Sequence, residues 1–163
     1  MSNRTAWTAG NGAGLTWTTL INSADMASMA TGASVLSSVS GIANGTNLDQ
    51  FMSISAQLAI SSSAVAAGAN LAFWLADLQS DGSTYGDGLL TAGTPSTSFT
   101  PGWNPIAVIP LYASTRATLV GSVNNIIIPP KTFAVIIQNN SGFSLTSGTQ
   151  TVKYITYNQQ LNN

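Results

Sequence analysis

The hydrophobic pattern of the chain is clearest near residue 130, where two short apolar runs lie close together. Residues 126–128 and 133–137 flank a break at 129–132 that contains two prolines, and the second run closes on the turn-forming sequence NNSG at 139–142. Apolar runs this short, rich in β-branched residues and bounded by turn residues, predict buried strands rather than helices. Since proline has no backbone N–H to donate to a ladder, Pro129 and Pro130 are predicted to lie in a connection or at the outermost residue of a strand.

A two-residue alternation predicts a further strand at 52–60. One face of this segment is apolar, whereas the other carries mainly serine and glutamine, as expected for a strand with one buried face. The next apolar segment, 70–78, has apolar residues on both faces. It is therefore predicted to lie either at the centre of a sandwich or under another subunit.

Weaker patterns predict the remaining strands, at 34–43, 103–113, 116–122, 143–147 and 150–157. With about eight strands separated by turn-forming residues, and no long helix, the chain is predicted to be all-β. The expected architecture is a two-sheet antiparallel β-sandwich, and an eight-stranded jelly roll is the favoured member of that group.

Residues 1–32 are predicted to be an extended N-terminal arm with one short helix, ahead of a sandwich at 33–163. Asn22 suits a helix N-cap, and Gly32 can end the helix. The first 19 residues are mostly small and polar, which does not support a core of their own, yet they contain Trp7 and Trp17. Two explanations stay open: the rings anchor the arm on a neighbouring subunit, or the arm folds back and both rings join the protein's own core.

The composition limits the kinds of partner. The charged fraction is 6% and the formal net charge is −1, whereas about 25% of the residues of a typical soluble domain are charged. A surface with so little charge repels other copies weakly, which favours association. The four basic residues are too few and too scattered to follow a nucleic-acid backbone. No segment has the roughly 18 to 20 consecutive apolar residues of a membrane span, so neither nucleic acid nor a membrane is an expected partner.

A polar loop after the 70–78 segment contains the candidate metal ligands Asp77, Asp81 and Asp87, together with several glycines. Calcium takes carboxylate and carbonyl oxygens, and glycines allow a loop to curl around the ion. The spacing of these residues does not match the EF-hand pattern. A solvated loop whose Asp-Gly pairs turn the chain is the preferred interpretation, so we expect no metal and no cofactor.

Enzymatic chemistry is not expected. The chain has no histidine, cysteine or glutamate, so the usual general bases and activated nucleophiles are missing. Asp81 and Asp87 form a carboxylate pair of the kind that hydrolyses glycosides, but they lie in a loop rich in glycine. A Ser-Lys mechanism would need Lys131 or Lys153 beside a serine, and nothing in the sequence singles out such a pair.

Two segments carry a resemblance to a known group of proteins. They are LAFWLADLQSDGSTYGDG at 71–88, a strand followed by an Asp-Gly loop, and IIIPPKTFAVIIQNNSG at 126–142. Together with the Ser/Thr/Asn-rich, charge-poor composition, they make residues 34–157 resemble the small jelly-roll decoration or cement proteins of tailed bacteriophages.

This resemblance implies a non-enzymatic virion protein that decorates and stabilises a capsid by bridging subunits of the major capsid protein. It also implies a homotrimer on the capsid surface, made in the host cytoplasm. Collar, tail and fibre proteins share the same style, so the position in the virion stays open. Trp7, Trp17 and Trp74 are the candidate interface residues.

The aromatic residues support an alternative function. Five rings could present their faces to sugars, as in a carbohydrate-binding β-sandwich module of a phage tail or fibre that acts in host attachment: Trp74, Tyr85, Trp103, Tyr112 and Tyr157. Aromatic residues spread over several strands are more often part of a core or an interface, so this function is the second choice.

Overall fold

The computed structural model describes residues 4–9, 15–27, 29–38, 41–59, 65, 67–86, 90–99, 101–112, 118–145 and 150–162. This part of the chain forms nine strands and one short helix: β1 (Arg4–Thr8), β2 (Thr18–Ile21), α1 (Ser23–Met26), β3 (Ser34–Leu36), β4 (Phe51–Ala59), β5 (Asn70–Asp77), β6 (Ala107–Pro110), β7 (Thr118–Ile127), β8 (Phe133–Asn140) and β9 (Thr151–Asn162).

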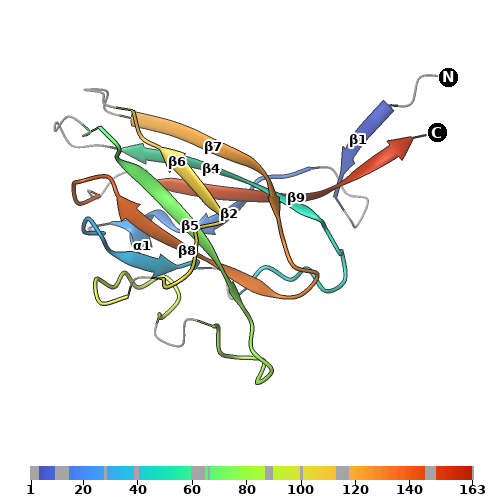
Figure 1. Ribbon diagram of the computed structural model, residues 1–163, viewed down its shortest axis with the longest axis horizontal. Helices are drawn as coiled ribbons and strands as arrows, with labels where there is room; N and C mark the ends of the chain where they lie inside the picture. Colours follow the sequence, from blue (N-terminus) through green and yellow to red (C-terminus); the bar gives the residue numbers. More distant parts are fainter. Residues whose placement is uncertain are drawn as a thin grey trace.

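The strands form two antiparallel sheets that lie in two layers (Figure 1). In the first sheet the order is β2-β9-β4-β7. The strand β1 also pairs with β9, at residues 158–162, which follow the part of β9 that pairs with β2. In the second sheet the order is β3-β8-β5-β6. Successive strands from β2 to β9 alternate between the sheets except at β5 and β6, which are neighbours. This order is that of an eight-stranded jelly roll, so the predicted fold class is confirmed, with β1 as an additional edge strand.

The core lies between the two sheets and follows from the alternating pattern of β4. Its apolar face, formed by Met52, Ile54, Ala56 and Leu58, is buried, as the sequence predicts. These side chains belong to one cluster with Phe73 of β5 and other residues of the second sheet. Each such aliphatic or aromatic side chain contributes roughly 1.5–3 kcal/mol on full burial.

The two-faced strand β5 lies at the centre of the second sheet, between β8 and β6, so the first of its two predicted alternatives holds. Its outer face carries Trp74, which is only 5% exposed. The ring joins a second, smaller cluster with Phe99 from the long connection between β5 and β6 and Ile136 of β8. The protein's own chain therefore covers the outer face of this sheet.

The N-terminal boundary and the helix differ from the prediction. Both β1 and β2 lie within residues 1–32, but they are strands of the first sheet. The helix spans only Ser23–Met26, and Asn22 makes no side-chain cap bond. The chain leaves the helix early because the carbonyl of Met29 accepts bonds from the Leu145 backbone N–H and the Asn139 side chain.

Two other predicted strands also differ. The segments 116–122 and 126–128 were expected to be separate, but β7 runs through both as one strand. Its register against β4 shifts near Val123, and Asn125 there has a φ of 59°, which is the geometry of a bulge. Residues 143–145 form no strand; instead, Leu145 is fully buried in the main core.

Candidate functional site

The outer face of the first sheet differs from that of the second sheet. Pairing places Val120, Gln57 and Thr151 side by side on it, and Trp17 lines the same hollow as these residues. Trp7 and Trp17 are 44% and 43% exposed, and Val120 is also exposed. We call this outer face, with Trp7, Trp17, Val120 and Ile155, the tryptophan face. No described segment of the chain covers it in the way that the β5–β6 connection covers the second sheet.

Trp7 is held on this face by two other rings. It meets Tyr157 edge-on, with centroids 5.1 Å apart and planes at 89°, and it meets Phe51 in the same manner at 6.3 Å. The Tyr157 hydroxyl is fixed in turn, because it donates to Asn125 Oδ1 at 3.0 Å and accepts from the Asn125 N–H at 3.1 Å. The strand β1 therefore rests on its own sheet, with almost half of the Trp7 surface still in solvent.

Trp17 lies between two hollows of the tryptophan face. It lines a shallow groove of about 410 Å³ with Trp7, Leu15, Ile155 and Tyr157. On its other side it borders the hollow beside Lys153 and Val120. The arm therefore folds back onto its own sheet, but neither ring joins a core cluster, and the anchoring of the rings on a neighbouring subunit stays a prediction.

Asp77 and Asp81, two of the three candidate metal ligands, each have a partner of their own. Asp77 Oδ2 forms an ion pair with Lys131 Nζ at 2.8 Å, whereas Asp81 lies in the turn that follows β5, and Asp87 lies outside the described residues. Hydrogen bonds from the Thr84 hydroxyl and from the Ser83 and Thr84 backbone N–H groups lower the pKa of Asp81 from 3.8 to about 2. In the described part of the chain, no group of three acidic, histidine or cysteine side chains is placed to hold a metal ion.

Calcium at millimolar concentration is expected to leave the melting temperature unchanged. Asp77 is neutralised by Lys131, and the Asp81 carboxylate already accepts hydrogen bonds within its own turn. An ion that bound the folded state alone would raise the melting temperature by mass action, and differential scanning fluorimetry with and without calcium measures this. A clear rise that is lost in Asp81→Ala would identify the loop as a metal site.

The depressed pKa of Asp81 also sets the pH at which its turn weakens. The folded state favours the ionised carboxylate, so its contribution to stability is fully present above the unfolded pKa of 3.8. This contribution is lost as the pH falls through about 2. The turn that follows β5 therefore keeps its hydrogen bonds at neutral and mildly acidic pH.

The five aromatic residues considered for sugar binding are dispersed. Trp74 and Tyr157 are buried, while Tyr112 is 75% exposed at the end of β6. Trp103 alone among the five lines a groove of about 770 Å³ that opens between the ends of β5 and β7. The sequence named Trp103, but it carried no signal that the 127–130 segment would lie opposite.

No protein family, curated protein or solved structure matches this chain. Within the described residues, no helix has the length and apolar character needed to cross a membrane.

Proposed function

We propose that the protein is a non-enzymatic structural protein of a bacteriophage virion, which decorates the capsid and bridges subunits of the major capsid protein. The observation that supports this function best is the tryptophan face. Two half-exposed indoles lie on the open face of one sheet, whereas the corresponding face of the other sheet is closed by the protein's own chain. An attachment surface accounts for this asymmetry.

The energetics of such a face suit a repeated contact. Tryptophan is enriched among the residues that dominate interface energies, and truncating one well-packed ring costs roughly 2 kcal/mol or more. The chain carries few charges, since only 6% of its residues are charged, so binding would require little desolvation of charge. Attachment of each copy to the assembled shell, but not to its free parts, stabilises the shell by mass action.

The proposal includes a symmetric homo-oligomer, with the trimer as the preferred state. The charge-poor surface supports an oligomer. The apolar outer face of β5 does not, because the protein's own chain covers it. Closed symmetry would bury exposed apolar surface without forming open filaments. Light scattering that finds a stable monomer at micromolar concentration would contradict the trimer.

Co-sedimentation with shells assembled from the major capsid protein of the same virus tests the proposed function. Wild-type protein should pellet with the shells, and Trp17→Ala should bind about 30-fold more weakly, because a loss of roughly 2 kcal/mol corresponds to that factor. Trp17 is preferred to Trp7, whose ring also packs on Phe51 and Tyr157. A deletion of residues 2–19 is unsuitable, since it would remove the first half of β2.

Tyr112→Ala is the matched control, because it removes a highly exposed ring that lies outside the tryptophan face. It should bind shells as the wild type does. Absence of wild-type binding at saturating shell concentration would overturn the proposed function. Equal binding by Trp17→Ala and Tyr112→Ala would remove the tryptophan face as the attachment surface.

A further inference from the structure

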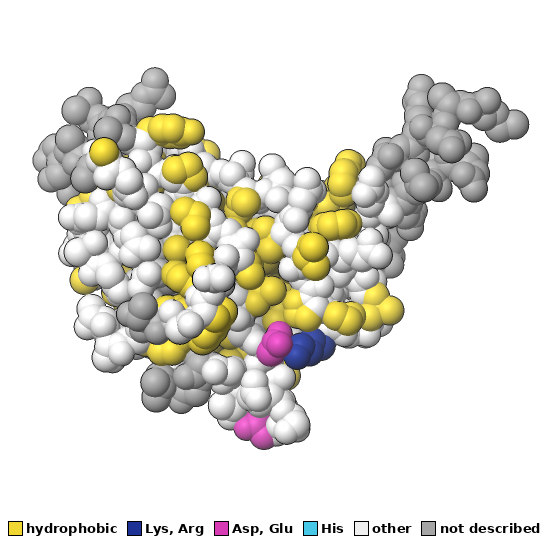
Figure 2. Space-filling model, in the orientation of Figure 1, with side chains coloured by type: hydrophobic (Ala, Val, Ile, Leu, Met, Phe, Trp, Pro, Cys, Tyr) yellow, Lys and Arg dark blue, Asp and Glu magenta, His cyan; other side chains and the backbone are white. Residues whose placement is uncertain are grey.

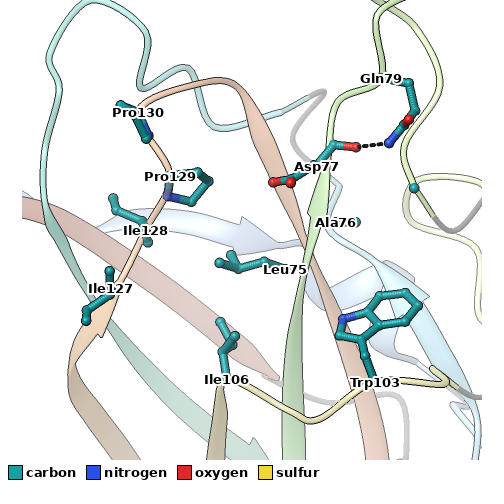
Figure 3. Close-up of a pocket in the computed structure, with 11 residues that line it drawn as sticks. Leu75, Ala76, Asp77, Gln79, Trp103, Ile106, Ile127, Ile128, Pro129 and Pro130 are labelled. Carbon is teal, nitrogen blue, oxygen red and sulfur yellow. Dashed lines mark hydrogen bonds between the residues drawn. The ribbon is translucent and has the colours of Figure 1, made fainter.

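We propose that the groove between the ends of β5 and β7 binds a neutral saccharide, with the Trp103 ring as its stacking platform. Figure 3 shows Trp103 on one side and the 127–130 segment on the other, with Leu75 and Ile106 between them. Its volume, about 770 Å³, lies in the range of small-molecule sites, which are mostly apolar with a few well-placed polar groups.

The platform side of the groove is held in place. The indole N–H of Trp74, itself buried, donates to the backbone carbonyl of Trp103 at 2.7 Å. The Trp103 ring meets Phe99 at 6.5 Å and 69°, an edge-to-face arrangement that fixes aromatic rings. The ring is nevertheless 43% exposed, so it combines a fixed position with a free surface.

The opposite wall is fixed from a different part of the chain. The Asn44 amide donates to the backbone carbonyl of Pro129 at 2.8 Å. Asn44 is itself anchored, since it donates to the Asp49 carbonyl at 2.8 Å and accepts from the Asp49 N–H at 2.7 Å. Both walls are therefore set before a ligand arrives, which reduces the ordering cost of binding.

The polar groups of the groove and its edge select for an uncharged ligand that both donates and accepts hydrogen bonds. Asp77 and Lys131 cancel each other's charge through their 2.8 Å ion pair, and both side chains are about half exposed. The carboxylate accepts hydrogen bonds, the ammonium donates them, and the Gln79 amide does both. Sugar hydroxyls match such a mixed set, and the C–H face of a sugar ring matches an indole. In Figure 2 hydrophobic side chains gather above one acidic and one basic side chain that lie next to each other.

Side-chain recognition favours a sugar over an extended peptide. A peptide strand needs free backbone groups on the wall of its groove. Here the Ile106 N–H already donates to the Phe73 carbonyl at 2.8 Å, and the Ile128 N–H donates to the Gln50 carbonyl at 3.2 Å. Neither N–H is available to a peptide, whereas the Trp103 ring is 43% exposed and the side chains of Asp77 and Lys131 are about half exposed.

A glycan array that carries neutral and anionic glycans, followed by calorimetric titration with the best neutral oligosaccharide, tests this site. Wild-type protein should bind neutral glycans. Trp103→Ala should weaken binding about tenfold or more, which corresponds to the loss of one stacking contact. Asp77→Asn keeps the shape of the side chain and should weaken binding about threefold, because it removes a charged acceptor. Tyr112→Ala, which removes an exposed ring elsewhere, should bind like the wild type.

Several results would overturn the proposal. They are the absence of wild-type binding to every neutral glycan at millimolar concentration, binding of anionic glycans alone, or undiminished binding by both Trp103→Ala and Asp77→Asn. Displacement of the bound sugar by apolar peptides, with tighter binding of the peptide, would assign the groove to a protein partner instead. If Trp103→Ala fails to fold, Asp77→Asn alone decides between the outcomes.

Discussion

Replacing Asn139 by alanine is expected to destabilise the protein by about 3 kcal/mol or more. Asn139 is fully buried at the end of β8. Its side-chain amide donates to the carbonyls of Met29 and Phe143, both at 2.9 Å, and its side-chain oxygen accepts from the Ser141 N–H at 3.1 Å. Alanine would leave the Ser141 N–H without its acceptor, and it would remove one of two hydrogen bonds at each carbonyl, since Met29 also accepts from the Leu145 N–H and Phe143 from the Ser141 hydroxyl. A buried unsatisfied group costs roughly 1–3 kcal/mol, and each lost hydrogen bond about 1 kcal/mol.

Chemical denaturation measures this loss, which corresponds to a fall of about 10 °C in melting temperature for a chain of this size. Asn140→Ala is the matched control, since the neighbouring amide is only partly buried and bonds two other side chains, Asn70 and Gln138, at 3.2 Å. It should cost about 1 kcal/mol or less. Similar losses in the two variants would contradict the role assigned to Asn139.

The sequence predicted those strands whose pattern of buried and exposed side chains can be seen within a few consecutive residues. In β4 the alternation follows the sheet directly, because successive side chains point to opposite faces and only one face meets the core. In β8 the apolar run predicted the strand, but its end was placed too early. Asn139 and Asn140, expected to start a turn, continue the ladder to β5, because the Asn139 side chain finds its partners inside the fold.

Strands whose stability comes from distant partners were not predictable in this way. β1 and β2 have only five and four residues, too few for a clear periodicity, and both pair with β9, at the other end of the sequence. β1 extends along the far half of β9, away from the body of the sandwich (Figure 1). No local periodicity marks such a pairing, since its hydrogen bonds and ring contacts exist only after the chain has folded.

For the candidate sites, the sequence identified single residues, whereas their surroundings are known only from the structure. The sequence identified Trp7 and Trp17 as rings that need an explanation, but the sheet that carries them is known only from the structure. Trp74, chosen for the apolar outer face of its strand, is covered by a loop with no regular pattern. The groove beside Trp103 unites three separate segments of the chain, so its lining could not be read from any one of them.

Replacing Gly121 by alanine is expected to destabilise the sandwich by about 2 kcal/mol. Gly121 lies on β7 opposite Ala56 of β4, on the inner face of the first sheet. A Cβ atom at this position would collide with the Cγ2 methyl of Ile109, a buried residue of β6 in the second sheet. The absence of a side chain at Gly121 therefore allows the edges of the two sheets to close against each other, and overpacking such a site costs roughly 1–3 kcal/mol.

A double-mutant cycle separates this clash from a simple effect of removing glycine. Ile109→Ala removes the methyl group in question, so Gly121→Ala should cost about 1 kcal/mol less in that background, a coupling typical of residues in contact. Gly45→Ala is the control, because a Cβ atom there meets no atom within 4 Å, and it should change the free energy of unfolding by less than about 0.5 kcal/mol. Equal costs of Gly121→Ala in both backgrounds would show that contact with Ile109 is not the cause.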